Sequence, residues 1–465
     1  MGDMMNDYPL VDIPVAASSS HGVPLDSLGY QETYRSIVHA LDGDMESRRR
    51  ADEALVQRGA LYHGAPVPWS VVPKVFSRSD VSYLAWIAEM MGRIMDKVTE
   101  AYVADPLVRA FFSFDPRVEA ACRAPVPYER PIPIARVDIF LDEETGDFQF
   151  CELNTDGSAG MLATSEITQV NLETEAGRLF ARDHAVSVFD IYGACADAIL
   201  DAYRSAGGSA EHPVVAAIDY RESVNAPEIA RFVDVFSELG ASLRFADIRD
   251  LAYEDGVLRD AVGPIDCVWR RLVISDLEGR PSPGVDAFLA CANEGRVPMV
   301  GAFRTWPCAT KTVFALFHDE LAERILDAEE LAFVRAHVPA TYMLDTQSDL
   351  SRFTQRERWI AKPRDGFNGK GVQAGSECTN AEWLDVLQEM ARSGGTVQAY
   401  APQFYTMNAD GSVADGVKRE EPHSNMEGLY LFNGRFAGVF TRCGTTAVIG
   451  ALTGRLNMGC LVVDE

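Results

Sequence analysis

Apolar residues recur at intervals of three and four along the N-terminal part of the chain. From Ser27 to about Phe114 this spacing predicts helices, most clearly over 81–98, where apolar side chains share one helix face. Stripes of this kind usually pack, so we expect a core there and not a cofactor site. Residues 1–25 show no sustained period and are predicted to form an extended or poorly ordered leader, followed by a helical region over 26–130.

The pattern changes at the proline-rich segment 125–133, which cannot continue a helix. Residues 134–141 and 147–153 have strand character and are joined by a polar turn that contains Gly146, which predicts a β-hairpin. Helical spacing returns over 162–204. We therefore expect one structural unit over 131–210, with the hairpin as its first feature.

Strands and helices alternate between residues 211 and 300. The expected strands are 214–218, 242–247, 267–273 and 298–300, and the expected helices are 229–239 and 285–292. This alternation predicts a small α/β unit with a largely parallel sheet. The remaining unit, 301–465, mixes helices near 312–338 and 381–393 with strands near 358–362, 396–400, 428–432 and 435–441. The fold class expected for the whole chain is α+β combined with α/β.

The amino-acid composition disfavours some classes of binding partner and indicates a cellular compartment. Lys plus Arg total 42 against 69 for Asp plus Glu, and the resulting charge of −27 disfavours nucleic acid and anionic membrane surfaces. No stretch is long and apolar enough to span a bilayer, and the N-terminus lacks the positive region of a secretory signal. The nine cysteines form no Cys-x-x-Cys pair, which favours reduced thiols in a cytoplasm. The oligomeric state stays open.

The predicted hairpin carries two pairs of polar residues at strand spacing. Arg136 and Asp138 lie two apart on the first strand, and Glu152 and Asn154 lie two apart on the second, so each pair shares a face. Antiparallel pairing can bring the two acids and the amide together as oxygen ligands for Mg²⁺. The alternative is an ordinary solvent-facing side of an amphipathic hairpin. Cys151 is expected on the opposite face, as a core thiol.

Two lysines indicate a nucleotide. Lys362 ends a predicted strand and precedes a loop with glycines at 366, 369 and 371, whose backbone can approach a triphosphate. Lys311 stands near the start of a predicted helix, where the helix dipole favours anions over cations. A lysine at this position is tolerated best if it meets a phosphate. The strand that contains Gln398 and Tyr400 can offer backbone groups to a purine. The alternative for the loop is a plain turn between strands.

Taken in order, these residues resemble a known family. The set is Arg136-x-Asp138, Glu152-x-Asn154-x-Asp156, Lys311, Lys362-Pro363 with its glycine-rich loop, Gln398, and Gly438-Val439-Phe440-Thr441-Arg442. It resembles the glutathionylspermidine synthetase type of circularly permuted ATP-grasp enzymes over about residues 50–450. The metal motif precedes the lysines, as the permuted group implies, and residues 211–300 resemble its pre-ATP-grasp unit.

The resemblance implies a carboxylate–amine ligase that uses ATP and Mg²⁺ and forms an acyl phosphate. Asp138, Glu152 and Asn154 would hold Mg²⁺, and Arg136 and Arg442 would stabilise charge on the phosphoryl group and the acyl intermediate. The residues implied to bind ATP are Lys311, Lys362, Gly366, Gly369, Gly371, Gln398 and Tyr400. The partners implied are a small-molecule or peptide carboxylate and an amine.

The departures from the family concern the substrates. No amidase domain precedes the ligase motifs, and Cys443-Gly444-Thr445-Thr446 stands where an acidic residue is expected, so glutathione and spermidine are not expected. Thr155, Asp156 and Ser158 are candidates to face the acid. Arg270 and Arg271 are candidates to bind its carboxylate, with an ion pair between domains as the alternative. A silent ATP-binding regulatory module, a phosphotransferase and a ligase acting on a protein tail remain alternative functions.

Overall fold

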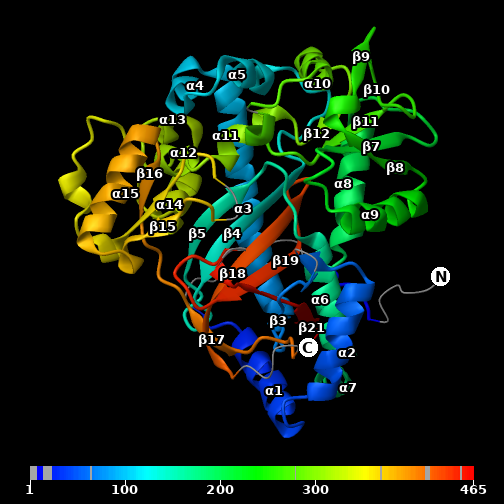
Figure 1. Ribbon diagram of the computed structural model, residues 1–465, viewed down its shortest axis with the longest axis vertical. Helices are drawn as coiled ribbons and strands as arrows, with labels where there is room; N and C mark the ends of the chain where they lie inside the picture. Colours follow the sequence, from blue (N-terminus) through cyan, green and yellow to red (C-terminus); the bar gives the residue numbers. More distant parts are fainter. Residues whose placement is uncertain are drawn as a thin grey trace.

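The computed structural model describes residues 8–13, 23–62, 65–277, 279–366, 369–413, 419–450 and 453–464, and it shows a mixed α/β fold (Figure 1). Residues 1–7 and 14–22 of the predicted leader, and Phe367 and Asn368 of the glycine-rich loop, lie outside these ranges. The described part of the leader makes contacts, because Leu10 forms a β-bridge with Val188.

The N-terminal region is largely helical, as predicted. Its helices are α1 (Ser27–Ala40), α2 (Met45–Gln57), α3 (Arg78–Ala104), α4 (Pro106–Phe112) and α5 (Pro116–Arg123). A capping box between Ser77 and Asp80 starts α3, whose apolar stripe is buried in the core as the sequence pattern predicts. The region also contains strands that the sequence pattern did not predict: β1 (Leu61–Tyr62), β2 (Ala65–Pro66) and β3 (Lys74–Ser77).

The central sheet is built from segments far apart in the sequence. Its strands run β20-β19-β18-β4-β5, and β17 pairs with one end of β18. Their bounds are β4 (Ile134–Leu141), β5 (Phe148–Asn154), β17 (Tyr405–Asn408), β18 (Glu421–Phe432), β19 (Arg435–Gly444) and β20 (Leu456–Met458). The predicted β4–β5 hairpin is therefore confirmed. In Figure 1 the sheet occupies the middle of the molecule and α3 passes behind it.

A smaller sheet joins the N-terminal helical region to the C-terminal strand of the described chain. Its order is β3-β21-β6, formed by β3, β21 (Cys460–Val463) and β6 (Val186–Ser187). Helices α6 (Met161–Glu173), α7 (Glu175–Asp183) and α8 (Ile191–Ser205) connect the hairpin to the next unit.

The predicted α/β unit is present and its four-stranded sheet is parallel. The strand order is β12-β11-β7-β8. Its elements are β7 (Val214–Asp219), α9 (Ala226–Glu238), β8 (Ser242–Asp247), β11 (Cys267–Arg270), α10 (Pro283–Glu294) and β12 (Met299–Val300), with a hairpin of β9 (Ala252–Glu254) and β10 (Val257–Arg259) inserted. The unit lies at the upper right of Figure 1.

The unit that follows has a small apolar core of its own. Helices α11 (Trp306–Ala309), α12 (Thr312–Leu316), α13 (Ala322–Ile325) and α14 (Ala328–His337) lead into the sheet β13-β16-β14-β15. The strands are β13 (Thr341–Met343), β14 (Trp359–Lys362), β15 (Gln373–Ala374) and β16 (Thr396–Ala399), and α15 (Asn380–Ser393) packs against them. This sheet lies at the left of Figure 1, beside the central sheet.

Short 3-10 helices complete the described chain: Ile248–Asp250, Ile274–Leu277, Phe303–Thr305, Leu350–Phe353, Arg356–Arg358 and Gly375–Glu377. Within the described residues, no helix combines the length and the hydropathy needed to cross a membrane.

Candidate functional site

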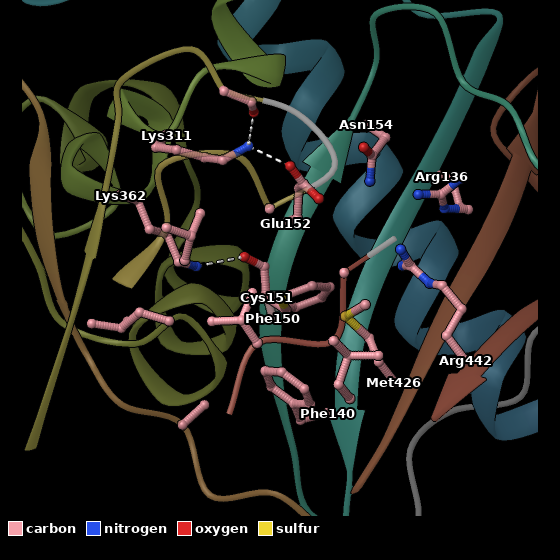
Figure 2. A pocket seen from close by; sticks show the side chains of 18 of the residues that line it. Arg136, Phe140, Phe150, Cys151, Glu152, Asn154, Lys311, Lys362, Met426 and Arg442 are labelled. Carbon is pink, nitrogen blue, oxygen red and sulfur yellow. Dashed lines mark hydrogen bonds and ion pairs between the residues drawn. The ribbon is translucent and has the colours of Figure 1, made fainter. Parts of the chain in front are cut away.

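A cavity of about 220 Å³ is walled on one side by the central sheet and on the other by β14 and β16. Figure 2 shows side chains of the β4–β5 hairpin on one wall, and Lys311 and Lys362 reaching in from the other. The lining comprises Arg136, Phe140, Phe150, Cys151, Glu152, Asn154, residues 156–159, Val273, Lys311, Ile360, Lys362, Gly366, Gly369, Val372, Gln398, Tyr400, Ala401, Gln403, Met426, Arg442, residues 447–450 and Arg455. Residues from distant parts of the sequence thus share one cavity.

The β4–β5 hairpin turns the two predicted polar pairs toward this cavity. The strand register places Asp138 opposite Glu152 and Arg136 opposite Asn154, the arrangement that strand alternation predicts. Arg136, Glu152 and Asn154 line the cavity, whereas Asp138 lies just beneath the lining with no exposed surface.

Asp138 is held by two arginines. Arg136 donates from Nε to Oδ1 at 2.7 Å and from Nη2 to Oδ2 at 3.1 Å, and Arg442 on β19 also donates to Oδ2. Burial alone would raise the pKa of Asp138, but the two guanidinium groups hold that pKa below its usual value. Asp138 is therefore an ionised carboxylate whose desolvation two cations offset.

An aromatic ring organises the arginines. The guanidinium carbons of Arg442, Arg136 and Arg455 lie 4.8, 5.0 and 5.9 Å from the centre of the Phe440 ring. Neither Phe440 nor Arg455 was predicted to belong to the site. The spacing gave a signal for Phe440, since it stands two residues before Arg442 and so shares its strand face.

A glycine leaves room for these side chains. Gly428 on β18 pairs with Asp138, and a Cβ placed on it would lie 2.8 Å from Arg136 Nε and 2.9 Å from Asp138 Oδ1. Both contacts are closer than real Cβ atoms approach, so the arginine–aspartate pair needs glycine at this position.

Lys311 bridges the two walls. It directly precedes α12, and its Nζ donates to Glu152 and, at 3.2 Å, to the carbonyl oxygen of Gly366 (Figure 2). The Lys311 side chain is 8% exposed and that of Glu152 is 24% exposed. A predicted phosphate ligand and a predicted metal ligand thus bind each other.

Lys362 ends β14 and is buried. Its Nζ donates to the carbonyl oxygen of Cys151 at 3.0 Å and to Gln398 Oε1 at 2.6 Å, and Gln398 Nε2 donates in turn to Thr341 Oγ1 at 2.8 Å. Burial lowers the pKa of the Lys362 ammonium, and the charge of Lys311 lowers that pKa further. An anion in the cavity would relieve both effects.

The cavity has an apolar end between the two sheets. Phe140 and Met426 from the central sheet face Ile360 and Val372 from the other wall, and Tyr400 borders them. Apolar walls beside convergent polar groups are typical of small-molecule sites. A flat aromatic base would find apolar surface here, next to the two lysines.

Cys151 is not the core thiol that the sequence predicted. The β4–β5 register shifts between Asp138 and Ile139, because Glu152 pairs with Asp138 and Phe150 pairs with Ile139. Cys151 is therefore the extra residue of a β-bulge, which breaks the strict alternation of faces, and it lines the cavity.

Part of the glycine-rich loop borders the cavity beside Lys311 and Lys362. Gly369 and Gly371 have φ angles of +73° and +74°, which glycine adopts at little cost. Gly366 and Gly369 line the cavity, whereas Gly371 packs near Pro363 and is not part of the lining. A Cβ on Gly369 would meet Val448, so this loop abuts the loop that follows β19.

Three residues that follow the metal motif were predicted to face the acid, and they differ in placement. Ser158 lines the cavity and donates to the carbonyl oxygen of Asn154 at 2.8 Å. Asp156 borders it, but its carboxylate is bound elsewhere. Thr155 is buried outside the lining, where its hydroxyl donates to the carbonyl oxygen of Thr305 at 2.7 Å.

The two arginines proposed to bind a substrate carboxylate are both absent from the cavity lining. Arg270 is paired with Asp156, and Arg271 is paired with Glu228 on α9 while stacking 4.7 Å from the Trp269 ring. The alternative interpretation, an ion pair between units, describes the contact of Arg270, whereas the ion pair of Arg271 lies within the α/β unit. The sequence could not show this because their partners are far away along the chain.

The oxygen donors are of the kind that Mg²⁺ takes. Asp138, Glu152 and Asn154 occupy adjacent positions on one face, and the amide nitrogen of Asn154 is buried without a hydrogen-bond partner. Among the described residues, no group of three or more His, Cys, Asp or Glu side chains could hold a metal, and the set predicted here consists of two carboxylates and one amide oxygen. Both carboxylates already have cationic partners, so Mg²⁺ would have to compete with Arg136 and Arg442 for Asp138 and with Lys311 for Glu152.

Comparison with known proteins supports the fold. No protein-family model and no curated protein matches the chain. Among solved structures, a glutathione synthetase-like effector from Globodera pallida, in its apo form, is 12% identical, with a TM-score of 0.63 over 90% of this chain and 97% of that one. The chain therefore shares the fold of this glutathione synthetase-like effector, in agreement with the resemblance that the motifs indicate.

Two other structures are matched less well. A presumed gamma-glutamylcysteine synthetase from Methylobacillus flagellatus KT is 12% identical over 80% of this chain and 88% of its own, with a TM-score of 0.40. A D-cycloserine synthetase is 14% identical over 54% of this chain and 92% of its own, with a TM-score of 0.26. Scores this low do not describe a shared fold.

Proposed function

We propose that this protein is an ATP-dependent carboxylate–amine ligase with a circularly permuted ATP-grasp arrangement. The observation that carries the proposal is the pairing of two walls around one cavity. Lys311 and Lys362 stand on one wall, and Glu152 and Asn154 on the other, with Asp138 beneath them. Cations for phosphates and oxygens for a metal therefore meet at one place.

ATP fits the two ends of the cavity. Its base would lie at the apolar end near Tyr400 and Gln398, and its phosphates would reach Lys311, Lys362 and the backbone of the glycine-rich loop. Mg²⁺ held by Asp138, Glu152 and Asn154 would neutralise phosphate oxygens. Burial makes the charged form of Lys362 unfavourable, and a nearby anion offsets this cost. This lysine therefore favours binding of phosphate.

The chemistry needs no protein nucleophile. A carboxylate oxygen of the acid attacks the γ-phosphorus of ATP, the bond to the bridging oxygen breaks, and ADP leaves an acyl phosphate behind. A neutral amine attacks the acyl carbon, inorganic phosphate leaves, and the amine proton passes to solvent. Arg136 and Arg442, which both line the cavity, would stabilise the charge that develops on the phosphoryl and acyl oxygens.

The acid and the amine are small molecules or peptides. The fold shared with a glutathione synthetase-like effector supports a ligase, and the altered segment 443–446 after Arg442 argues against glutathione and spermidine as substrates. The cationic end of the cavity, with Arg136, Arg442 and Arg455 around Phe440, suits an anionic acid better than a cationic one.

The test is Mg²⁺-dependent release of ADP and phosphate against a panel of acids, amines and short peptides. Turnover that requires both an acid and an amine, and that is lost in Glu152→Gln, is expected. A phosphorylated acid formed without an amine would instead indicate a phosphotransferase. Tight ATP binding with no turnover would indicate a regulatory module, and absence of ATP binding would overturn the proposal. Glu323→Gln, an exposed acid paired with Arg335, is the control.

A further inference from the structure

A single buried carboxylate anchors the loop after β5 to the α/β unit. Oδ1 of Asp156 accepts a hydrogen bond from Arg270 Nη1, and Oδ2 accepts one from the backbone N–H of Ile274 at 2.9 Å. The side chains of Arg270 and Asp156 are 0% and 3% exposed. Both oxygens of Asp156 are therefore used up inside the protein.

The anchor point is the place in this unit where a ligand would be expected. In the order β12-β11-β7-β8, the first strand, β7, has β8 on one side and β11 on the other, so the direction of winding reverses between β7 and β11. Open parallel sheets bind ligands outside the carboxyl ends of their strands at such a reversal. Arg270 is the last residue of β11.

Arg270 is built into this position as an anion receptor. Its Nε donates to the carbonyl oxygen of Gly301, Nη1 also donates to that of Leu272 at 2.7 Å, and the guanidinium lies 5.5 Å from the Phe303 ring. Its Nη2 is buried with no hydrogen-bond partner. A fixed guanidinium and one backbone N–H thus converge on a carboxylate.

We infer that Asp156 is a positioning residue: its carboxylate is the internal ligand of this anion site and holds residues 157–159 against the cavity. The neighbouring contacts support this. A Cβ on Gly157 would lie 2.7 Å from the carbonyl oxygen of Arg271, and Arg271 Nη1 donates to the carbonyl oxygen of Ser158 at 2.9 Å. Three successive residues of the loop, 156–158, therefore contact the α/β unit.

The anchored loop also reaches the arginine cluster. The carbonyl oxygen of Ala159 accepts a hydrogen bond from Arg136 Nη1 at 2.8 Å and one from the Tyr430 hydroxyl at 3.2 Å. The loop therefore connects the α/β unit to a residue implied in the chemistry. Lys311 and Lys362, which are predicted to bind ATP, come from other elements. Loss of the Asp156 contacts should therefore alter binding of the acid and leave binding of ATP unchanged. This effect on the acid rests on the proposed ligase function, whereas the anion site itself does not.

The first test replaces the internal ligand with an external one. Asp156→Ala removes the carboxylate and leaves Arg270 unpaired, so a lower melting temperature is expected. Formate should raise the melting temperature of Asp156→Ala much more than that of the wild type. Arg270→Met in the same background should remove the response. Asp183→Ala, which removes an exposed acid paired with Arg182, controls for general effects of formate.

The second test keeps the volume of the side chain. Asp156→Asn offers one acceptor oxygen to a site with two donors, so the Ile274 amide should exchange its hydrogen about ten-fold faster or the Arg270 contact should be lost. With an acid that supports turnover, its KM should rise by about ten-fold while the KM for ATP stays unchanged.

Failure of the inference and failure of the ligase proposal are distinguishable. If formate does not stabilise Asp156→Ala selectively and Asp156→Asn leaves both the exchange rate and the KM of the acid unaltered, Asp156 is not the ligand that positions the loop. If no acid supports turnover, the ligase proposal fails, and the formate and exchange experiments still decide the role of Asp156.

Discussion

Lys311 donates a hydrogen bond to Glu152, so a lysine predicted to bind phosphate and a carboxylate predicted to bind metal are each other's partner. Either ligand alone has to separate this pair, and that leaves one charge without its counter-ion. Bound together, nucleotide and metal satisfy both side chains. The contact would therefore make the two proposed binding events interdependent.

Glu152→Gln should change how ATP binding depends on Mg²⁺. Without metal, the variant should bind ATP about five-fold more tightly than the wild type, because Lys311 is free and an ion pair of this exposure is worth about 1 kcal/mol. With Mg²⁺, the order should reverse because a metal ligand is missing. Calorimetric titration with ATP, in chelator and in Mg²⁺, measures both. Equal affinities of the two proteins in chelator would contradict the prediction.

Lys362→Met should weaken ATP binding by roughly ten- to hundred-fold, the range expected for loss of a charge-assisted hydrogen bond. Burial lowers the pKa of Lys362, and an anion should raise that pKa again. At pH values between the two pKa values, ATP binding should therefore take up protons in the wild type and take up fewer in the variant. Calorimetry in buffers with different ionisation heats tests this, and equal proton uptake would refute it.

Gly428→Ala should damage the site through steric conflict. The new methyl group would press on Arg136 and Asp138, and overpacking of this kind costs about 1–3 kcal/mol of unfolding free energy. We expect loss of ATP turnover in a protein that still folds, checked by turnover and denaturant unfolding. Gly444→Ala in the adjacent strand is the matched control, since its Cβ would meet Ile449 at an ordinary 3.6 Å. Similar turnover in both variants would show that Gly428 is not required.

A buried cluster on the face of the central sheet that points away from the cavity should make the free energy of unfolding depend on pH. Glu427 and Glu143 share one cation, Lys74, and all three side chains have no exposed surface. Burial raises the pKa of Glu427 to about 7, an effect that Lys74 opposes and Glu143 reinforces. The folded protein therefore favours the protonated form of Glu427.

Because the pKa of Glu427 is higher in the folded protein than its ordinary value, protonation of this group favours folding. The contribution of Glu427 to the free energy of unfolding is therefore complete below the ordinary pKa of 4.5 and is lost as the pH rises through about 7. Over this window the wild type should lose up to roughly 3 kcal/mol relative to Glu427→Gln, which cannot titrate. Denaturant unfolding of both proteins across the window measures the difference. Parallel pH profiles would show that Glu427 is not the group responsible.

The sequence was most informative where a short period fixes geometry. Strand alternation placed Arg136, Asp138, Glu152 and Asn154 on one face, and the structure has the expected register. The parallel α/β unit could be predicted for the same reason, because each strand and helix has its own spacing. These features depend on neighbours within a few residues.

What the sequence did not show depends on distant contacts. The strand β3 is too short to give a pattern and exists through its pairing with β21. The partners of Arg270 and Arg271, Asp156 and Glu228, are far away along the chain, so an ion pair and a substrate site look alike in sequence. The bulge at Cys151 inverts one position of a strand, which simple alternation cannot anticipate.

The pairing of β4 with β18 has a consequence for how the protein is made. The hairpin leaves the ribosome long before its partner strand, because residues 155–420 have to be synthesised in between. At ordinary elongation rates that interval is roughly ten seconds to a minute. During it, one edge of β4 is an unpaired strand rich in apolar side chains, open to pairing with another chain. Slow translation or a truncated product should therefore aggregate, and a chaperone that covers this edge would be needed most before residue 432 emerges.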